Sequence, residues 1–257
     1  MNKLQTIDLP GRLWKLEIAE KGNGLGFEFR NEDELQATFA YLDDSRKLWG
    51  PFEMPESWWV TLDAVVEGKL LIRSYEDHTN PTSRKLWFLE VVKNEILWEA
   101  EKFLPADIID GKLYGGFVED GERKPAFIEL ESGEAHWLEE EIKIDPKNGD
   151  NPVKIAHYAE DSEYFEKIRV FIEKKAGDTI QKGVDYFQSD AQIVISYYIY
   201  EEECLINKLH IYDRKGALLL ESILAENLPN ITLQSFFVVS DQLIFVNRHN
   251  QLCIYDL

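Results

Sequence analysis

Apolar and polar residues alternate in short segments along most of the chain, and Gly, Asn or Asp residues separate these segments. Segments 68–72, 85–90 and 96–98 are examples: they are rich in aromatic and aliphatic residues, and a polar loop and a tight turn join them. A period of two, this composition and these turn residues predict strands rather than helices. We therefore expect an all-β protein.

The predicted strands recur in a repeated order of strand, loop, strand, turn and strand. Five copies cover residues 25–49, 68–98, 111–137, 192–220 and 242–257. Gly68 and Gly111, which open two successive copies, are 43 residues apart. A period of about 40 to 45 residues with four strands per unit is typical of a β-propeller blade. The fourth, innermost strand would precede the turns, at 62–66, 106–109, 184–187 and 235–239.

The two ends of the chain suggest how the ring closes. The last copy stops at Leu257 after its third strand, so it lacks an outer strand. Segment 12–16 resembles the outer strand at 46–49, but the other strands of its blade are missing. Pairing these two ends would leave no open sheet edge. The sequence thus predicts one domain over 1–257, a five-bladed β-propeller closed by an N-terminal strand.

Residues 161–175 break the strand pattern. Their apolar positions follow a helical stripe, formed by Tyr164, Phe165, Ile168, Phe171 and Ile172. Asp161 or Ser162 can cap the start of a helix, and Gly177 suits its end. The helix lies in a gap of about two repeat periods. It is either an insertion at about 150–180 or the remnant of a sixth blade, and we favour the insertion.

Two resemblances follow from these repeats. The run Ser-Gly-Glu-Ala-His-Trp at 132–137 is similar to the Gly-Glu-x-x-Trp element that ends the repeats of quinoprotein-type propellers. Five blades are too few for a quinone-cofactor enzyme of that group, so the resemblance implies the fold and not that chemistry. The whole chain also resembles an uncharacterised bacterial domain-of-unknown-function family, which implies no activity.

Charge narrows the range of partners. The chain of 257 residues carries 28 Lys and Arg against 48 Asp and Glu, a formal net charge of −20. Nucleic acid and anionic membrane surfaces are therefore disfavoured, because both attract basic proteins. A basic or neutral partner is expected. Residues 1–10 lack the apolar stretch of a secretion signal, and no run approaches the roughly 18 apolar residues of a membrane helix, so we expect a cytoplasmic protein.

Carboxylates mark the predicted innermost strands. Asp63, Asp107 and Asp185 each precede a turn by about five residues, and Glu20 has a comparable place in the first copy. In a propeller these positions would converge at one mouth of the central channel. We expect no organic cofactor, but such a cluster could bind a divalent cation in the central channel or perform acid–base chemistry on a sugar. Alternatively, each Asp accepts backbone N–H groups in its own loop.

Trp58 and Trp59 lie in the connection between the first two predicted blades, 25–49 and 68–98. Exposed aromatic side chains on a propeller face are favoured anchors for a protein or a small ligand. Burial between adjacent blades is the alternative.

The sequence contains no recognisable catalytic motif, so we favour a non-catalytic binding or interaction module whose partner is a protein or a small ligand. The alternative is a hydrolase, glycan-directed, that uses Asp63, Asp107 and Asp185 at the central channel.

Overall fold

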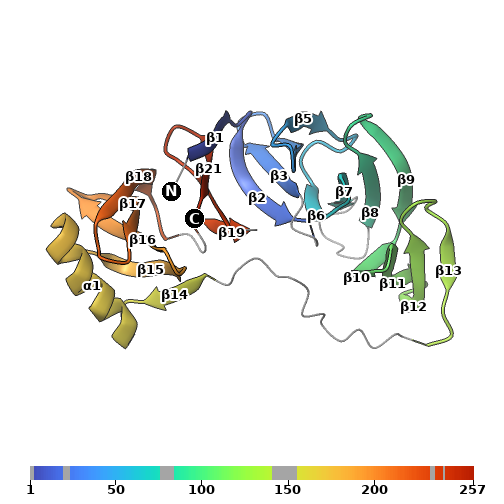
Figure 1. Cartoon of the computed structure of the whole chain (residues 1–257). Coiled ribbons are helices and arrows are strands. Elements are labelled where there is room, and N and C mark those ends of the chain that lie inside the picture. Colours follow the sequence, from blue (N-terminus) through green and yellow to red (C-terminus); the bar gives the residue numbers. More distant parts are fainter. Residues whose placement is uncertain (1–2, 20–23, 76–83, 141–154, 232–234, 240) are drawn as a thin grey trace. The chain divides into compact units, whose positions relative to one another are not determined.

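The computed structural model describes residues 3–19, 24–75, 84–140, 155–231, 235–239 and 241–257 (Figure 1). In this part of the chain the regular elements are strands and a single α-helix, which confirms the all-β prediction. The chain divides into two compact units. One consists of Pro10–Asp150, and the other consists of Met1–Leu9 together with Asn151–Leu257. No helix in the described part has the length and apolar character that a membrane span needs.

The unit Pro10–Asp150 contains three four-stranded antiparallel sheets, and in each sheet successive strands pair with one another. The first consists of β2 (Arg12–Ile18), β3 (Gly24–Asn31), β4 (Gln36–Asp43) and β5 (Leu48–Glu53). The second consists of β6 (Val60–Val66), β7 (Lys69–Tyr75), β8 (Arg84–Glu90) and β9 (Glu95–Glu101). The third consists of β10 (Phe103–Ile109), β11 (Lys112–Glu119), β12 (Glu122–Glu129) and β13 (Ala135–Trp137).

The other unit contains two sheets among its described residues. One has five strands: β14 (Ala156–Ala159), β15 (Gln181–Gln188), β16 (Gln192–Glu201), β17 (Cys204–Asp213) and β18 (Leu218–Leu228). The other has four: β19 (Phe237–Val239), β20 (Gln242–Val246), β21 (Gln251–Asp256) and β1 (Lys3–Asp8). The last sheet therefore combines strands from the two ends of the sequence.

The strand that completes this last sheet is not the one expected. Segment 12–16 lies in β2 and opens its own sheet by pairing with β3, whereas β1 pairs with β21, with Thr6 opposite Cys253. Strand β2 follows the local route because a short hairpin closes at a lower entropic cost than a pairing across the whole chain. The sequence pattern does not predict strand β1, because Leu4 and Ile7 do not alternate regularly with polar residues.

Helix α1 (Glu163–Ala176) forms as predicted, with both ends capped. The Ser162 hydroxyl accepts a hydrogen bond from Phe165 N at 3.2 Å, and Gly177 ends the helix in the left-handed conformation with φ 76°. Its buried residues pack against the five-stranded sheet; they are Phe165, Ile168 and Ile172. Between β13 and β15 the described residues form β14 and α1, and the insertion stays a prediction.

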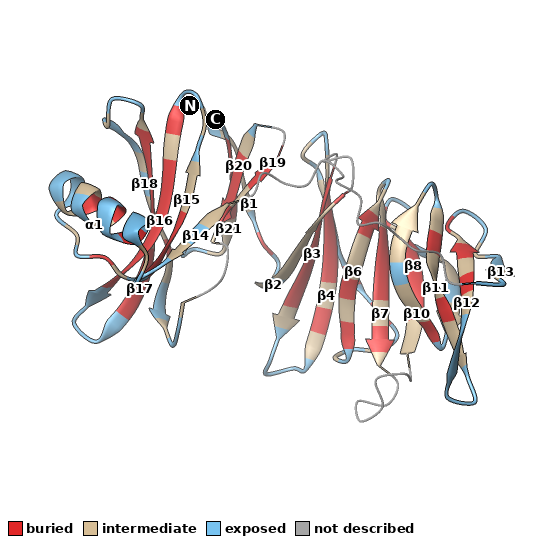
Figure 2. Ribbon diagram, turned by 90° about the horizontal axis from the view of Figure 1, so that it is seen from below, coloured by how far each residue is buried: buried red, intermediate tan, exposed pale blue. Residues whose placement is uncertain are grey.

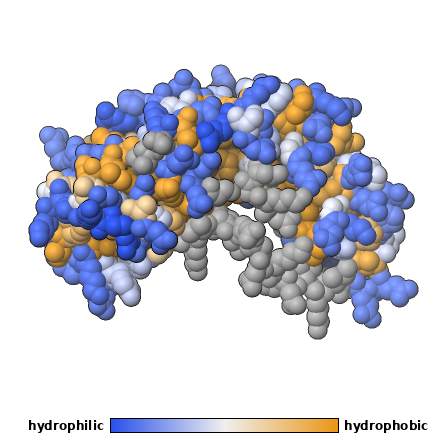
Figure 3. Space-filling model, viewed as in Figure 1, coloured by the Kyte–Doolittle hydropathy of each residue, from blue (hydrophilic) through white to orange (hydrophobic). Residues whose placement is uncertain are grey.

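Face-to-face packing of sheets makes the core of the unit Pro10–Asp150. Figure 2 shows buried residues in the middle of β3, β4 and β7, whereas hydrophilic residues cover much of the face drawn in Figure 3. Gly26 of β3 lies against β6: a Cβ there would be 2.5 Å from Cγ2 of Val65 and 2.9 Å from Cδ2 of Leu62. A glycine is thus required where the first two sheets approach each other.

A buried polar network lies behind α1 in the other unit. The Tyr197 hydroxyl donates to Asp178 Oδ2 at 2.7 Å and contacts the ring of His210 at 3.0 Å. Nδ1 of His210 lies 2.9 Å from the Tyr212 hydroxyl, and Nε2 lies 3.4 Å from a carboxylate oxygen of Glu221. Burial lowers the pKa of His210 despite the nearby Glu221 and Asp178 carboxylates.

We expect acidification to destabilise the protein in part through His210. The folded-state pKa lies below the unfolded value near ~6.5. The unfolded chain therefore binds more protons, and the free energy of unfolding falls as pH drops through that value. In urea unfolding at pH 7 and pH 5, His210→Gln should show a smaller loss of stability than wild type. His249→Gln, at an exposed position, is the control. A pH dependence equal to wild type in His210→Gln would contradict this role.

The β1–β21 pairing predicts an engineered cross-link. Residues directly opposite one another in antiparallel strands have Cβ atoms about 4.5–5.5 Å apart, close to the separation a disulfide needs. In a Cys204→Ser background, oxidised Thr6→Cys should form a disulfide with Cys253, detected by thiol titration, and should raise Tm. Gln5→Cys, which lies opposite Ile254, should keep its thiol. Two free thiols in Thr6→Cys after oxidation would refute the register.

Candidate functional site

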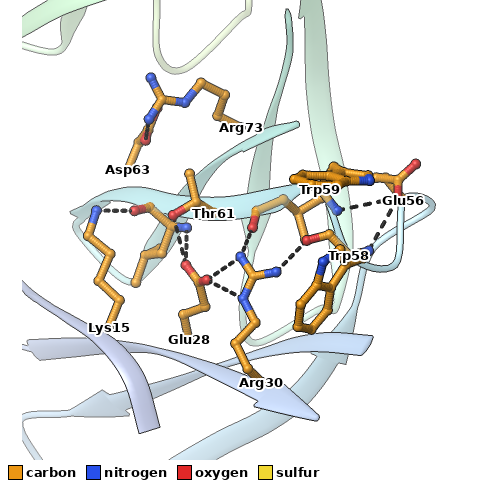
Figure 4. Close-up of polar contacts among 11 residues, drawn as sticks. Lys15, Glu28, Arg30, Glu56, Trp58, Trp59, Thr61, Asp63 and Arg73 are labelled. Carbon is orange, nitrogen blue, oxygen red and sulfur yellow. Dashed lines mark hydrogen bonds and ion pairs between the residues drawn. The ribbon is translucent and has the colours of Figure 1, made fainter. Parts of the chain in front are cut away.

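The guanidinium of Arg30 joins β3 to the connection that enters β6 (Figure 4). Its Nη1 donates to the backbone carbonyl of Trp58, and its Nη2 donates to that of Val60. These carbonyls flank Trp59, so Arg30 holds the backbone of the connection on both sides of that residue.

Glu28 supplies the charge that keeps Arg30 in place. Its side chain is fully buried, and Oε1 lies 2.8 Å from Nε and 2.6 Å from Nη2 of Arg30. The other oxygen, Oε2, accepts hydrogen bonds from the Thr61 hydroxyl at 2.9 Å and from Leu62 N at 2.8 Å. Both carboxylate oxygens are therefore satisfied, which a buried charge requires. The Glu28–Arg30 pair links the first sheet to the second.

Aromatic rings surround this pair. The Arg30 guanidinium lies 4.8 Å from the ring centre of Trp58 and 5.8 Å from that of Trp14, within the range of cation–π attraction. Glu56 Oε1 accepts hydrogen bonds from the backbone N–H groups of Trp58, at 3.2 Å, and of Trp59, at 3.4 Å. We call these five residues the Arg30 surface: Trp14, Arg30, Glu56, Trp58 and Trp59.

The two tryptophans were expected either to be exposed or to be buried between blades, and they differ in this respect. Trp58 is partly buried against Arg30, whereas Trp59 is 48% exposed. Trp14, whose exposed fraction is 60%, presents a further indole. The Arg30 surface therefore combines a fixed backbone with large apolar rings in contact with solvent. Binding by Trp58 and Trp59 stays a prediction.

Asp63 lies in a β-bulge of β6, between Leu62 and Ala64. Its Oδ1 forms an ion pair with Nη2 of Arg73 at 2.9 Å, while in the described part of the chain Oδ2 has no hydrogen-bond partner. Burial raises the pKa of Asp63, although Arg73, Lys15 and Arg84 oppose the shift. This environment favours the protonated form of Asp63.

Asp107 does not occupy the position that corresponds to Asp63. In β10 the bulge falls at Ala106, and Asp107 is paired in register with Tyr114. The carboxylate oxygen Oδ1 of Asp107 accepts a hydrogen bond from Ile108 N at 2.8 Å. Asp63 stands five residues before Gly68, whereas Asp107 stands four before Gly111, so the two carboxylates are not equivalent. The Asp107 carboxylate instead bonds the next backbone N–H within β10.

Asp185 connects three segments of its own unit. It is 2% exposed, and Oδ1 lies 2.7 Å from Nδ1 of His157 in β14. Oδ2 accepts hydrogen bonds from the backbone N–H and the hydroxyl of Ser235, ahead of β19. The carboxylate thus ties β14 to β15 and anchors the segment that leads into the next sheet.

The cation hypothesis stays a prediction. Glu20 lies outside the described residues. Among the described His, Cys, Asp and Glu residues, no group of three or more is placed to hold a metal ion. Asp63, Asp107 and Asp185 have separate sets of protein partners, and for Asp63 an arginine supplies the positive charge.

Glu28 and Arg30 are not among the site residues predicted from the sequence. A signal was present: in Phe27-Glu28-Phe29-Arg30 two opposite charges alternate with two aromatic residues, so the charges share one face of a strand. Alternation of this kind usually means that the charged face meets solvent. Here β6 covers that face, and the charges are buried.

Breaking the Glu28–Arg30 pair should be costly. Glu28→Gln leaves Arg30 buried without a counter-charge, and we expect a loss of about 3–5 kcal/mol in the free energy of unfolding. Urea denaturation of Glu28→Gln, Arg30→Gln and the double variant should show that the double loses much less than the two single variants together. The exposed pair Arg12 and Glu32 is the matched control, with little effect expected. Additive losses at Glu28 and Arg30 would show that the two charges are not coupled.

Comparison with known proteins places part of the chain in context. Residues 18–98, which contain the Arg30 connection and most of the first two sheets, match the family model "Domain of unknown function (DUF4905)". The resemblance to a family of this kind is confirmed over that stretch. No curated protein matches the chain significantly.

Among solved structures, the chain is similar to β-propeller domains. The β-propeller domain of the Trilobed protease from Pyrococcus furiosus, reported with an open velcro topology, is 12% identical with a TM-score of 0.37, and the match covers 91% of this chain and 74% of that one. Prolyl oligopeptidase B from Galerina marginata is 12% identical with a TM-score of 0.35, covering 93% of this chain and 30% of that one.

Proposed function

We propose that the protein is a non-catalytic binding module of the β-propeller type. In this proposal the five sheets are the blades of one ring, which β1 closes by completing the last sheet. Two observations support it: four-stranded antiparallel meanders, one of which is extended by β14, and the pairing of β1 with β21. The open edge of an incomplete blade is thereby covered.

The Arg30 surface is the proposed recognition site. The observation that carries this proposal is the exposure of Trp59 on a backbone that Arg30 and Glu56 hold from both sides. Binding sites depend on a few aromatic residues, and a backbone that is already ordered loses little entropy when a ligand arrives. Trp59 therefore has the properties of an anchor residue.

One observation favours the hydrolase alternative. Burial raises the pKa of Asp63, as a general acid in a glycan-directed hydrolase needs. Against this, Asp107 and Asp185 are engaged by backbone or side-chain donors. Asp63 would also need a second carboxylate at about 5–10 Å. We therefore keep the binding module as the main proposal.

Replacement of Trp59 tests the recognition site. Ligands that bind the wild type on arrays of peptides and glycans would be measured again with Trp59→Ala. We expect Kd to rise about 5- to 30-fold, the effect of losing an anchor residue worth about 1 to 2 kcal/mol. Trp137→Ala is the matched control, because Trp137 lies in the same unit and is 56% exposed. Equal losses in the two variants would remove the Arg30 surface as the site.

Replacement of Asp63 distinguishes a hydrolase from a non-catalytic binding module. The binding-module proposal expects no turnover of p-nitrophenyl glycosides by the wild type. If the wild type releases p-nitrophenol and Asp63→Asn abolishes the release while the variant stays folded by circular dichroism, the hydrolase replaces the binding module. Asp107→Asn is the comparison, since its carboxylate is held by a local amide.

A further inference from the structure

We infer that the Arg30 surface binds a basic, arginine-rich segment of a partner protein. The inference rests on the proposed function, because it names the ligand of the same surface. It begins with the carboxylates around Trp59. The turn between β3 and β4 exposes Glu32, Asp33 and Glu34, and Glu53 ends β5.

The backbone places these acidic residues at the same end of the first sheet as the tryptophans. Asn31 pairs with Gln36 across the β3–β4 turn. Next to this turn, Ala37 N donates to the carbonyl of Ser57 at 2.6 Å. Ser57 directly precedes Trp58, so the acidic turn and the aromatic connection are neighbours in space.

Two basic side chains next to the acidic turn are paired with carboxylates. Arg30 is paired with Glu28 inside the protein, and Arg12 forms an ion pair with Glu32 at 3.4 Å. The exposed rim therefore keeps an excess of negative charge. A chain with a formal net charge of −20 adds a long-range field that attracts cationic ligands and raises their association rate.

The tryptophans suit a guanidinium in particular. Arg30 itself lies over Trp58, which shows that an indole of this connection accepts a guanidinium at 4.8 Å. Trp59 is next in sequence and leaves almost half of its surface open. Cation–π attraction contributes about 0.5–1 kcal/mol at an exposed ring and more when the cation is desolvated. Stacking on Trp59 combined with the carboxylate rim therefore favours arginine in the partner over neutral side chains.

A nona-arginine peptide labelled with fluorescein is the probe, and its anisotropy gives Kd at 50 and 300 mM NaCl. Because such a peptide is attracted to any acidic protein, the result is read from matched variants. At 300 mM NaCl we expect Trp59→Ala to raise Kd about 3- to 10-fold and Trp137→Ala to change it less than twofold. Trp59→Phe should keep part of the affinity, since it retains an aromatic face.

A second pair of variants tests the rim. Asp33→Asn with Glu53→Gln removes two charges near Trp59, and Glu139→Gln with Glu140→Gln removes two exposed charges elsewhere in the same unit. At 50 mM NaCl the first pair should weaken binding several-fold more than the second. Circular dichroism and Tm confirm that each variant is folded.

Two results would overturn the inference, and they separate it from the proposed function. If the peptide binds all variants equally, the attraction is diffuse and the surface does not select arginine. If a neutral glycan or peptide, rather than nona-arginine, loses affinity in Trp59→Ala, the Arg30 surface is still a binding site but its ligand is not basic. If no ligand depends on Trp59, both the inference and the proposed function fail.

Discussion

A buried ion pair, Glu28 with Arg30, determines the arrangement around the first two sheets. Moving two charges out of water is costly, and the cost is offset only when both groups are fully hydrogen-bonded. Thr61 and Leu62 satisfy the free oxygen of Glu28, and two backbone carbonyls satisfy Arg30. Because all of these partners belong to β6 or to its entry, the pair permits few alternative positions for the second sheet relative to the first.

The same constraint explains why Trp59 is exposed. A large apolar side chain would normally pack against its neighbours. Here Arg30 donates hydrogen bonds to the carbonyls on either side of Trp59, and Glu56 accepts one from the Trp59 N–H, so the backbone of Trp59 is fixed. The buried charges thus fix the backbone of a tryptophan that keeps 48% of its surface exposed. An exposed ring on a fixed backbone distinguishes Trp59 from Trp137, which is also exposed but lies on a short edge strand.

The repeat gives each sheet the same strand order without giving its residues the same environment. The bulge falls at corresponding positions in β6 and β10, but Asp63 occupies it whereas Asp107 comes one residue after it. Asp63 therefore meets Arg73, and Asp107 meets a backbone amide. Through His157, Asp185 is tied to β14, a fifth strand that only this sheet has among the described strands. Chemical equivalence along a degenerate repeat thus depends on the register of each strand, because a residue in a bulge and the residue after it have different neighbours.

By itself the sequence determined the local elements: the strands from their alternation, the turns from Gly and Asp, and α1 from its stripe and from its caps Ser162 and Gly177. These features depend on neighbours within a few residues. Tertiary structure decided which N-terminal segment joins β21, that Glu28 and Arg30 are buried, and what each carboxylate binds. Apart from Asp107, which bonds the next residue in the chain, these outcomes depend on groups ten or more residues apart, such as Arg73 for Asp63 and Leu62 for Glu28. Packing within and between sheets selects them. The alternation of Phe27, Glu28, Phe29 and Arg30 predicts a strand, but only the approach of β6 turns its charged face into an interior one.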